Sequence, residues 1–206
     1  MAKEGFPFIL VPLLIALALA FFGWWLFAGV FAFLTAFMMY FFRDPSRMTP
    51  TEPGLIISAA DGRVTRIDET ADHKTVSVFL SPLDVHINRS PISGKVLQVT
   101  YIKGHKKPAT SDEASLINER NSIVIQGDGV TLTCTQIAGI VARRIVCWPK
   151  VGETLERGQR FGLIKFASRT DIKLPPDCQI AVKIGDRVRG GETVIARLEN
   201  KLATRS

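Results

Sequence analysis

The stretch Lys150-Val-Gly-Glu-Thr-Leu-Glu-Arg-Gly158 returns 33 residues later as Lys183-Ile-Gly-Asp-Arg-Val-Arg-Gly-Gly191. A second pair, Asp61-Gly-Arg-Val-Thr-Arg-Ile67 and Ser93-Gly-Lys-Val-Leu-Gln-Val99, repeats at an offset of 32 residues. In each unit a short apolar run enters or leaves a turn that contains glycine, which is typical of strands joined by tight hairpins. The two pairs therefore predict a β-rich domain containing hairpin pseudo-repeats.

The sequence around these repeats supports the same fold class. Short β-branched runs separated by Gly, Asp, Asn and Pro predict strands. The clearest runs are 76–80, 95–102, 122–126, 130–135 and 193–198. Helix signals are weak: 111–119 is the best stretch, and 136–144 fits a strand or a helix equally well. The repeated pattern resembles the hairpins of biotinyl and lipoyl carrier domains, so we expect a mainly β barrel or sandwich with lipoyl-like hairpin pseudo-repeats. The carrier function is not expected, because no lysine lies between two methionines.

The front of the chain predicts a membrane anchor. Residues 6–42 contain no charged residue, and one crossing needs roughly 20 apolar residues. Gly23, Trp24 and Trp25 lie at the midpoint, where a turn at the membrane interface would lie. We expect two short transmembrane helices near 6–22 and 25–42, which gives an anchor at 1–42 and a β-rich domain at 43–206. One long tilted helix is an alternative. A cleaved signal peptide fits less well, because the apolar run is long and ends in bulky residues.

Charge and cysteine usage indicate where the domain works. The net charge is +7 over 206 residues, which suits an anionic membrane surface. Positive residues flank both ends of the apolar segment, so the positive-inside rule places both ends, and the domain, on the cytoplasmic side of the plasma (inner) membrane. No Arg-rich helix or RNA-binding motif favours nucleic acid. Three widely spaced cysteines fit no metal pattern and are expected as reduced, mostly buried thiols.

Three segments hold residues that could carry chemistry. Asp84 and His86 lie two positions apart, so in an extended segment they share a face, and a carboxylate can orient an imidazole. Asp61 precedes Gly62, which by itself indicates only a turn. Ser168 ends a strand-like run, and a nucleophilic serine needs a base that local sequence cannot place. On local pattern alone, a structural role for each is the simpler interpretation.

Taken in order, several segments resemble the short, archaeal-type form of phosphatidylserine decarboxylase. Phe41-Phe-Arg-Asp-Pro-Ser-Arg47 is similar to the FFRDP-x-R segment of that family, and Ala60-Asp61-Gly62 to its ADG motif. Ser81-Pro-Leu-Asp-Val-His-Ile-Asn-Arg89 resembles SP-x-DVH-x-NR. Further family blocks match Asn118-Glu-Arg-Asn121 and Gln136-Ile-Ala-Gly-Ile-Val-Ala-Arg-Arg144. Arg160 to Asp171 is similar to the family's processing site, RFG-x-I-x-FGSR-x-D.

The resemblance implies a proenzyme that cuts itself before Ser168 into a large subunit (1–167) and a small subunit (168–206). The serine hydroxyl attacks the preceding carbonyl to give an ester. β-Elimination and hydrolysis then release ammonia and leave a covalent pyruvoyl cofactor. The mature enzyme would convert phosphatidylserine to phosphatidylethanolamine and CO2. Besides this lipid, the implied partners are an anionic membrane surface, the small subunit and a second copy of the chain as a homodimer.

The resemblance also implies residue roles. Asp61 and His86 would assist Ser168 in self-cleavage by the logic of a Ser-His-Asp triad, with Asp84 as a further orienting group. Longer bacterial members carry a second histidine three residues after the first. Here that position is Arg89, which leaves His86 for both self-cleavage and decarboxylation. A headgroup phosphodiester needs cationic partners, and Arg43, Arg47 and Arg89 are the candidates.

One departure from the family pattern concerns the cleavage site itself. The family has glycine before the serine, whereas this chain has Ala167. A methyl group crowds the carbonyl that Ser168 must attack, and a non-glycine residue is disfavoured wherever φ is positive. We expect slowed or blocked cleavage between Ala167 and Ser168.

Two other hypotheses are a membrane-anchored serine hydrolase that uses Ser168 directly, with His86 or Lys165 as base, and a non-catalytic lipoyl-like membrane adaptor.

Overall fold

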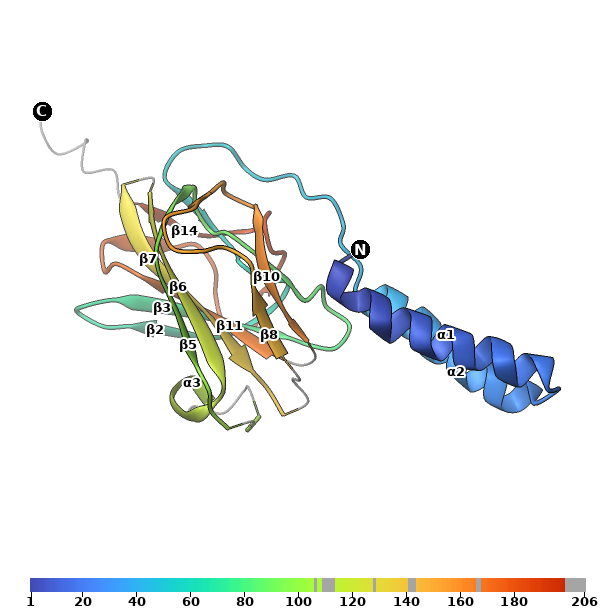
Figure 1. The fold of residues 1–206 in the computed structure, drawn as a ribbon. Helices are drawn as coiled ribbons and strands as arrows, with labels where there is room; N and C mark the ends of the chain where they lie inside the picture. Colours follow the sequence, from blue (N-terminus) through green and yellow to red (C-terminus); the bar gives the residue numbers. More distant parts are fainter. Residues whose placement is uncertain (106, 109–113, 128, 141–143, 166–167, 199–206) are drawn as a thin grey trace, which may run out of the picture. The chain divides into compact units, whose positions relative to one another are not determined.

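The computed structural model describes residues 1–105, 107–108, 114–127, 129–140, 144–165 and 168–198. Ala167 lies outside these residues. Backbone contacts divide the chain into two units, Met1–Ser46 and Arg47–Ser206. The first unit is helical and the second is mainly β (Figure 1).

The first unit is a pair of apolar helices. After a 3-10 turn at Lys3–Gly5, α1 (Phe6–Phe21) and α2 (Trp25–Phe41) run side by side (Figure 1). The turn between them contains Gly23, whose φ of 78° is disfavoured for other residues. The helix from Lys3 to Phe21 is long and apolar enough to cross a membrane, with a mean hydropathy of 2.2, whereas α2 is apolar but shorter. The expected pair of helices is therefore present, with each helix ending one residue earlier than expected.

The second unit is built around a curled, half-barrel-like sheet (Figure 1). The strand order in this sheet is β13-β2-β3-β11-β7-β6-β5-β9, and neighbouring strands pair antiparallel. Its strands are β2 (Gly62–Glu69), β3 (Lys74–Leu80), β5 (Gly94–Ile102), β6 (Arg120–Gly127), β7 (Val130–Ala138), β9 (Thr154–Leu155), β11 (Ser168–Leu174) and β13 (Arg187–Val188).

Among the described residues, two three-stranded sheets and one short helix complete the unit. The sheet orders are β1-β14-β12 and β4-β10-β8. Their strands are β1 (Leu55–Ile57), β4 (Ile87–Arg89), β8 (Arg144–Cys147), β10 (Arg160–Lys165), β12 (Cys178–Ile180) and β14 (Val194–Leu198). The helix α3 spans Ala114–Ile117. The expected strands are all present, and 136–138 belongs to β7, which settles part of the ambiguous stretch as strand.

One face of the large sheet forms the hydrophobic core. Alternate residues of the strands point to the same face, so Val76 and Val78 of β3 are buried together with Ile172 of β11 and Cys134 of β7. β2 and β5 each contain a register shift, at Val64–Arg66 and at Val96–Gln98. Such bulges increase local twist and help a sheet to curl.

The segments that repeat in the sequence make corresponding backbone contacts. Gly152 N donates to Val96 O and Gly185 N donates to Val64 O, both at 2.8 Å. Both glycines have positive φ, at 95° and 97°. Each repeat therefore places a glycine turn against a bulged strand. That these hairpins are lipoyl-like stays a prediction.

Candidate functional site

Ser168 is the first residue of β11, where it lies opposite Leu80 of β3 and Ala138 of β7. Its side chain is 0% exposed. Its Oγ is buried and has no hydrogen-bond partner among the residues that the structure describes. A hydroxyl usually finds a partner when it is buried, so this orphan hydroxyl is a candidate reactive group rather than a structural one.

His86 lies in the segment that leaves β3 beside Ser168. It is buried, and its carbonyl oxygen accepts a hydrogen bond of 3.2 Å from Ile164 N in β10. Its Nδ1 lies 2.9 Å from the carbonyl oxygen of Asp84. Because a carbonyl oxygen can only accept, Nδ1 must carry the hydrogen in this contact. In the neutral ring the lone pair is then on Nε2, which makes Nε2 the basic atom.

Asp84 orients His86 through its backbone instead of its carboxylate. Its Oδ2 accepts hydrogen bonds from Ser81 N at 2.8 Å and from Ser81 Oγ at 2.6 Å. Residues 81–86 form a turn rather than an extended segment, so the shared face expected for Asp84 and His86 does not apply. The carboxylate closes the turn, and the carbonyl oxygen holds the imidazole.

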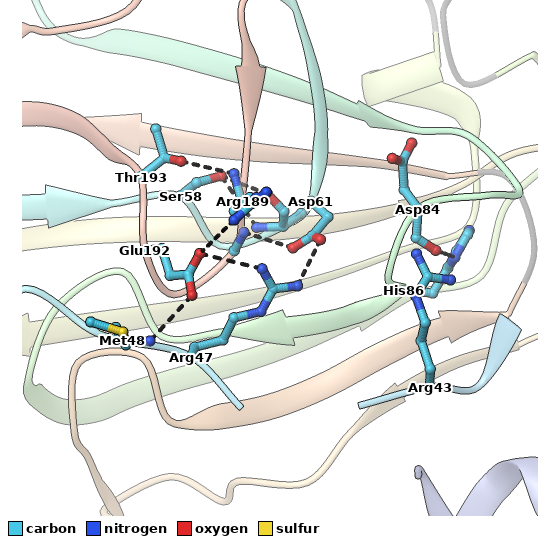
Figure 2. Close-up of polar contacts among 12 residues, drawn as sticks. Arg43, Arg47, Met48, Ser58, Asp61, Asp84, His86, Arg189, Glu192 and Thr193 are labelled. Carbon is cyan, nitrogen blue, oxygen red and sulfur yellow. Dashed lines mark hydrogen bonds and ion pairs between the residues drawn. The ribbon is translucent and has the colours of Figure 1, made fainter. Parts of the chain in front are cut away.

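Asp61 follows β1 and is held from two sides. Its Oδ2 lies 2.7 Å from Arg47 Nη2, and its Oδ1 accepts a 2.8 Å hydrogen bond from Gly190 N. Burial raises the pKa of the Asp61 carboxyl above its ordinary value, while the Arg47 charge and the two hydrogen bonds oppose that rise. Figure 2 shows Asp61 and the Asp84–His86 pair as two groups with separate contacts.

Arg47 links Asp61 to Glu192, which lies near the other end of the chain. Arg47 Nη1 lies 3.6 Å from Glu192 Oε2, and the Arg47 side chain is largely buried. Glu192 also accepts from Met48 N at 3.2 Å and lies 3.7 Å from Arg189 (Figure 2). Sequence reasoning missed Glu192, because it lies in none of the quoted motifs and 145 positions from Arg47.

The three arginines expected to bind a headgroup all make contacts within the chain. In the helical unit, Arg43 donates to Tyr40 O and lies over the Tyr40 ring. Arg47 pairs with Asp61 and Glu192, and Arg89 donates to Gly158 O at 3.1 Å. An open hollow of about 500 Å³ is lined in part by Arg47, Arg89, Arg157 and Arg160.

A chain of buried amides connects the strands around the site and was also missed. Asn121 Nδ2 donates to Gln136 Oε1, Gln136 Nε2 donates to Asn88 Oδ1, and Asn88 Nδ2 donates to Thr170 Oγ1, at 3.1, 2.8 and 3.0 Å. These residues belong to β6, β7, β4 and β11. Asn88 lies two residues after His86, and Thr170 lies two residues after Ser168. The signal was present, since Asn88, Asn121 and Gln136 lie within the quoted motifs.

Comparison with known proteins gives one consistent result. A profile of the phosphatidylserine decarboxylase family matches residues 34–196. A protein of Symbiobacterium thermophilum is 48% identical, and the match covers 96% of this chain and 95% of that protein. Proteins of Ralstonia nicotianae and Geotalea uraniireducens are 44% and 39% identical over 96% of this chain and 95% and 96% of their own. All three relatives are described as phosphatidylserine decarboxylase proenzymes.

Proposed function

Because the chain belongs to the phosphatidylserine decarboxylase family, we propose that it is a proenzyme that makes a pyruvoyl cofactor from Ser168 and then decarboxylates phosphatidylserine. The single observation that supports this most directly is the buried Ser168 hydroxyl, which has no hydrogen-bond partner among the described residues. A serine hydrolase must present its nucleophile to an external substrate, whereas a self-cleaving serine needs only the adjacent carbonyl. Full burial of Ser168 therefore favours self-cleavage.

His86 acts as the base in this proposal. Its Nε2 takes the proton of Ser168 Oγ as that oxygen attacks the carbonyl of residue 167. The Asp84 carbonyl oxygen holds Nδ1–H, so the lone pair stays on Nε2. The negative charge of Asp61 favours the imidazolium that forms, and Arg47 and Gly190 N fix that charge in place.

The pyruvoyl cofactor fits the position of Ser168. When present, it accepts the electron pair released as CO2 leaves. The start of β11, held between β3 and β7, would keep it fixed. His86 is the proposed proton donor in this second reaction. Arg43, Arg47 and Arg89 stay the proposed partners of the phosphodiester, and the hollow shared by Arg47 and Arg89 supports the last two.

We also propose that the helix pair anchors the protein in the plasma (inner) membrane with the domain on the cytoplasmic side. Many large apolar side chains of α1 and α2 are exposed, such as Leu14, Leu26 and Phe33, and a lipid environment would cover them. Positive charges at Lys3, Arg43 and Arg47 flank the apolar segment and favour the cytoplasmic side.

Intact mass spectrometry of an Ala167→Gly variant tests the proposal. We expect fragments corresponding to residues 1–167 and 168–206, with the smaller one blocked by a ketone that reacts with a hydrazide. The parent chain should cleave more slowly because of the Ala167 methyl group. The double variant Ala167→Gly/Ser168→Ala is the matched control and should stay whole. If the Ala167→Gly variant folds and also stays whole, Ser168 is no cofactor precursor and the proposal fails.

A further inference from the structure

Two exposed apolar side chains lie on either side of Ser168. Leu80 and Ala138 pair with Ser168 from the two neighbouring strands. Three residues beyond Leu80, Leu83 is 62% exposed, and two residues beyond Ala138, Ile140 is 60% exposed. Single exposed apolar residues are common on protein surfaces. These two differ because the sheet register brings both to the edge at which β11 begins.

The same edge carries positive charge. Arg144 and Lys165 lie opposite each other at the end of the β8–β10 pair. Lys165 is the last residue of β10 and lies three positions before Ser168, and Arg144 is exposed. Asp84 is the acidic residue of the neighbouring 81–86 turn, and its carboxylate is bonded to Ser81. Apolar side chains beside cations are the pattern with which proteins bind the surface of an anionic bilayer.

We propose that the edge formed by Leu83, Ile140, Arg144 and Lys165, called here the Ser168 edge, docks on an anionic bilayer surface. Leu83 and Ile140 enter the boundary between headgroups and acyl chains, and the two cations contact lipid phosphates. The proposal rests on the proposed function, since a lipid headgroup can reach a site at Ser168 only if that edge lies at the bilayer surface. It assigns a surface of the β unit that acts in addition to the helical anchor.

Fluorescence quenching in vesicles tests this docking. Leu83→Cys, Ile140→Cys and Val151→Cys would each be made in the full chain in a Cys147→Ala background, because Cys134 and Cys178 are buried. Each variant is labelled with an environment-sensitive dye and reconstituted in equal parts of phosphatidylcholine and phosphatidylglycerol containing a nitroxide lipid. Val151 is the matched control, being 61% exposed. The next residue, Gly152, donates to Val96 O, and Val96 pairs with Ile125, which pairs with Leu132. Leu132 lies roughly 20 Å along β7 from Ala138.

We expect a several-fold larger loss of fluorescence at positions 83 and 140 than at 151. Leaving out phosphatidylglycerol should reduce this difference. Equal quenching at the three positions, or none at 83 and 140, would overturn the proposal and point to a protein partner or to open solvent. The vesicle orientation is shared by all three variants, so it does not affect the comparison. The quenching does not require cleavage at Ser168, so docking can fail while the mass-spectrometric test of the proposed function succeeds.

Discussion

At the scale of single residues, the proposed mechanism requires that one buried carboxylate, that of Asp61, keeps its charge. Burial favours the protonated form of Asp61, whereas Arg47 favours the ionised form. In the proposed mechanism, Asp61 assists His86 only when its carboxyl group is ionised. When the pKa of Asp61 rises, its carboxylate loses its charge at a higher pH. Since Arg47 opposes that rise, removing the charge of Arg47 should change how self-cleavage declines at low pH.

We predict that Arg47→Gln shifts the acid limb of self-cleavage upward by about one pH unit, because glutamine can donate a hydrogen bond but carries no charge. The fraction cleaved would be measured against pH in the Ala167→Gly background, with circular dichroism as the check on folding. Arg47→Lys should restore most of the profile.

Arg189→Gln is the control for this prediction. Arg189 is exposed and lies near Glu192. Its loss should leave the acid limb unchanged. Superimposable profiles for Arg47→Gln and the parent would show that Arg47 does not set the ionisation of Asp61.

The contacts of these residues show what sequence could not supply. Motifs identified Asp61, His86 and Ser168 as candidates, but the partners that hold Asp61 come from tertiary structure. Gly190 lies 129 positions away and donates to Asp61 through its backbone N–H. A backbone donor leaves no residue-type signal, and neither does a carbonyl acceptor such as that of Asp84.

At the scale of elements, alternation and turn residues were sufficient to find the five strands with the clearest pattern, whereas short strands such as β1, β4 and β12 were not predicted. The runs at 76–80 and 95–102 correspond to β3 and β5, which begin two residues and one residue earlier. The stretch 136–144 was ambiguous because Gln136 breaks the apolar pattern. Its side chain is buried, and both its amide oxygen and its amide nitrogen are hydrogen-bonded, to Asn121, Asn88 and Val146 O. A periodicity argument counts any polar residue as exposed.

The start of β2 gives a sharp test of glycine at one position. Gly62 has a φ of 149°, and a Cβ there would meet the backbone oxygen of Phe79 in β3. Gly129 also has a positive φ, of 78°, but a Cβ there would meet open space. We predict that Gly129→Ala costs about 1 kcal/mol of unfolding free energy. Gly62→Ala should cost about 2 kcal/mol more, since β2 or β3 must also move.

Urea unfolding followed by circular dichroism would measure both glycine variants. Equal midpoints for the two would show that the backbone at Gly62 can move aside without cost.

At the scale of the whole molecule, the three cysteines report on the packing of all three sheets, because Cys134, Cys147 and Cys178 each lie in a different one. Cys134 lies in β7 of the large sheet and Cys178 in β12 of a small one, and both are buried. Burial raises the pKa of Cys178 to about 11 and also raises those of Cys134 and Cys147. Since the thiolate is the reactive form, folding should protect all three thiols near neutral pH.

We predict that iodoacetamide at about pH 8 modifies the folded chain slowly and at half-buried Cys147 first. In guanidinium chloride all three thiols should react, which mass spectrometry counts directly. Rapid modification of Cys134 in the native chain would contradict the packing described for β7.

The position of β11 in the strand order determines what a cut before Ser168 would do to the molecule. β11 lies between β3 and β7 in the middle of the large sheet, while β12, β13 and β14 pair with one another or with β1 and β2. The segment from Ser168 onward is thus interleaved with the rest of the chain. A cut would change the covalent connectivity and leave every strand neighbour in place. The two pieces could then part only by unfolding, so a dimer of unlike chains would arise from one gene with its stoichiometry fixed and no assembly step.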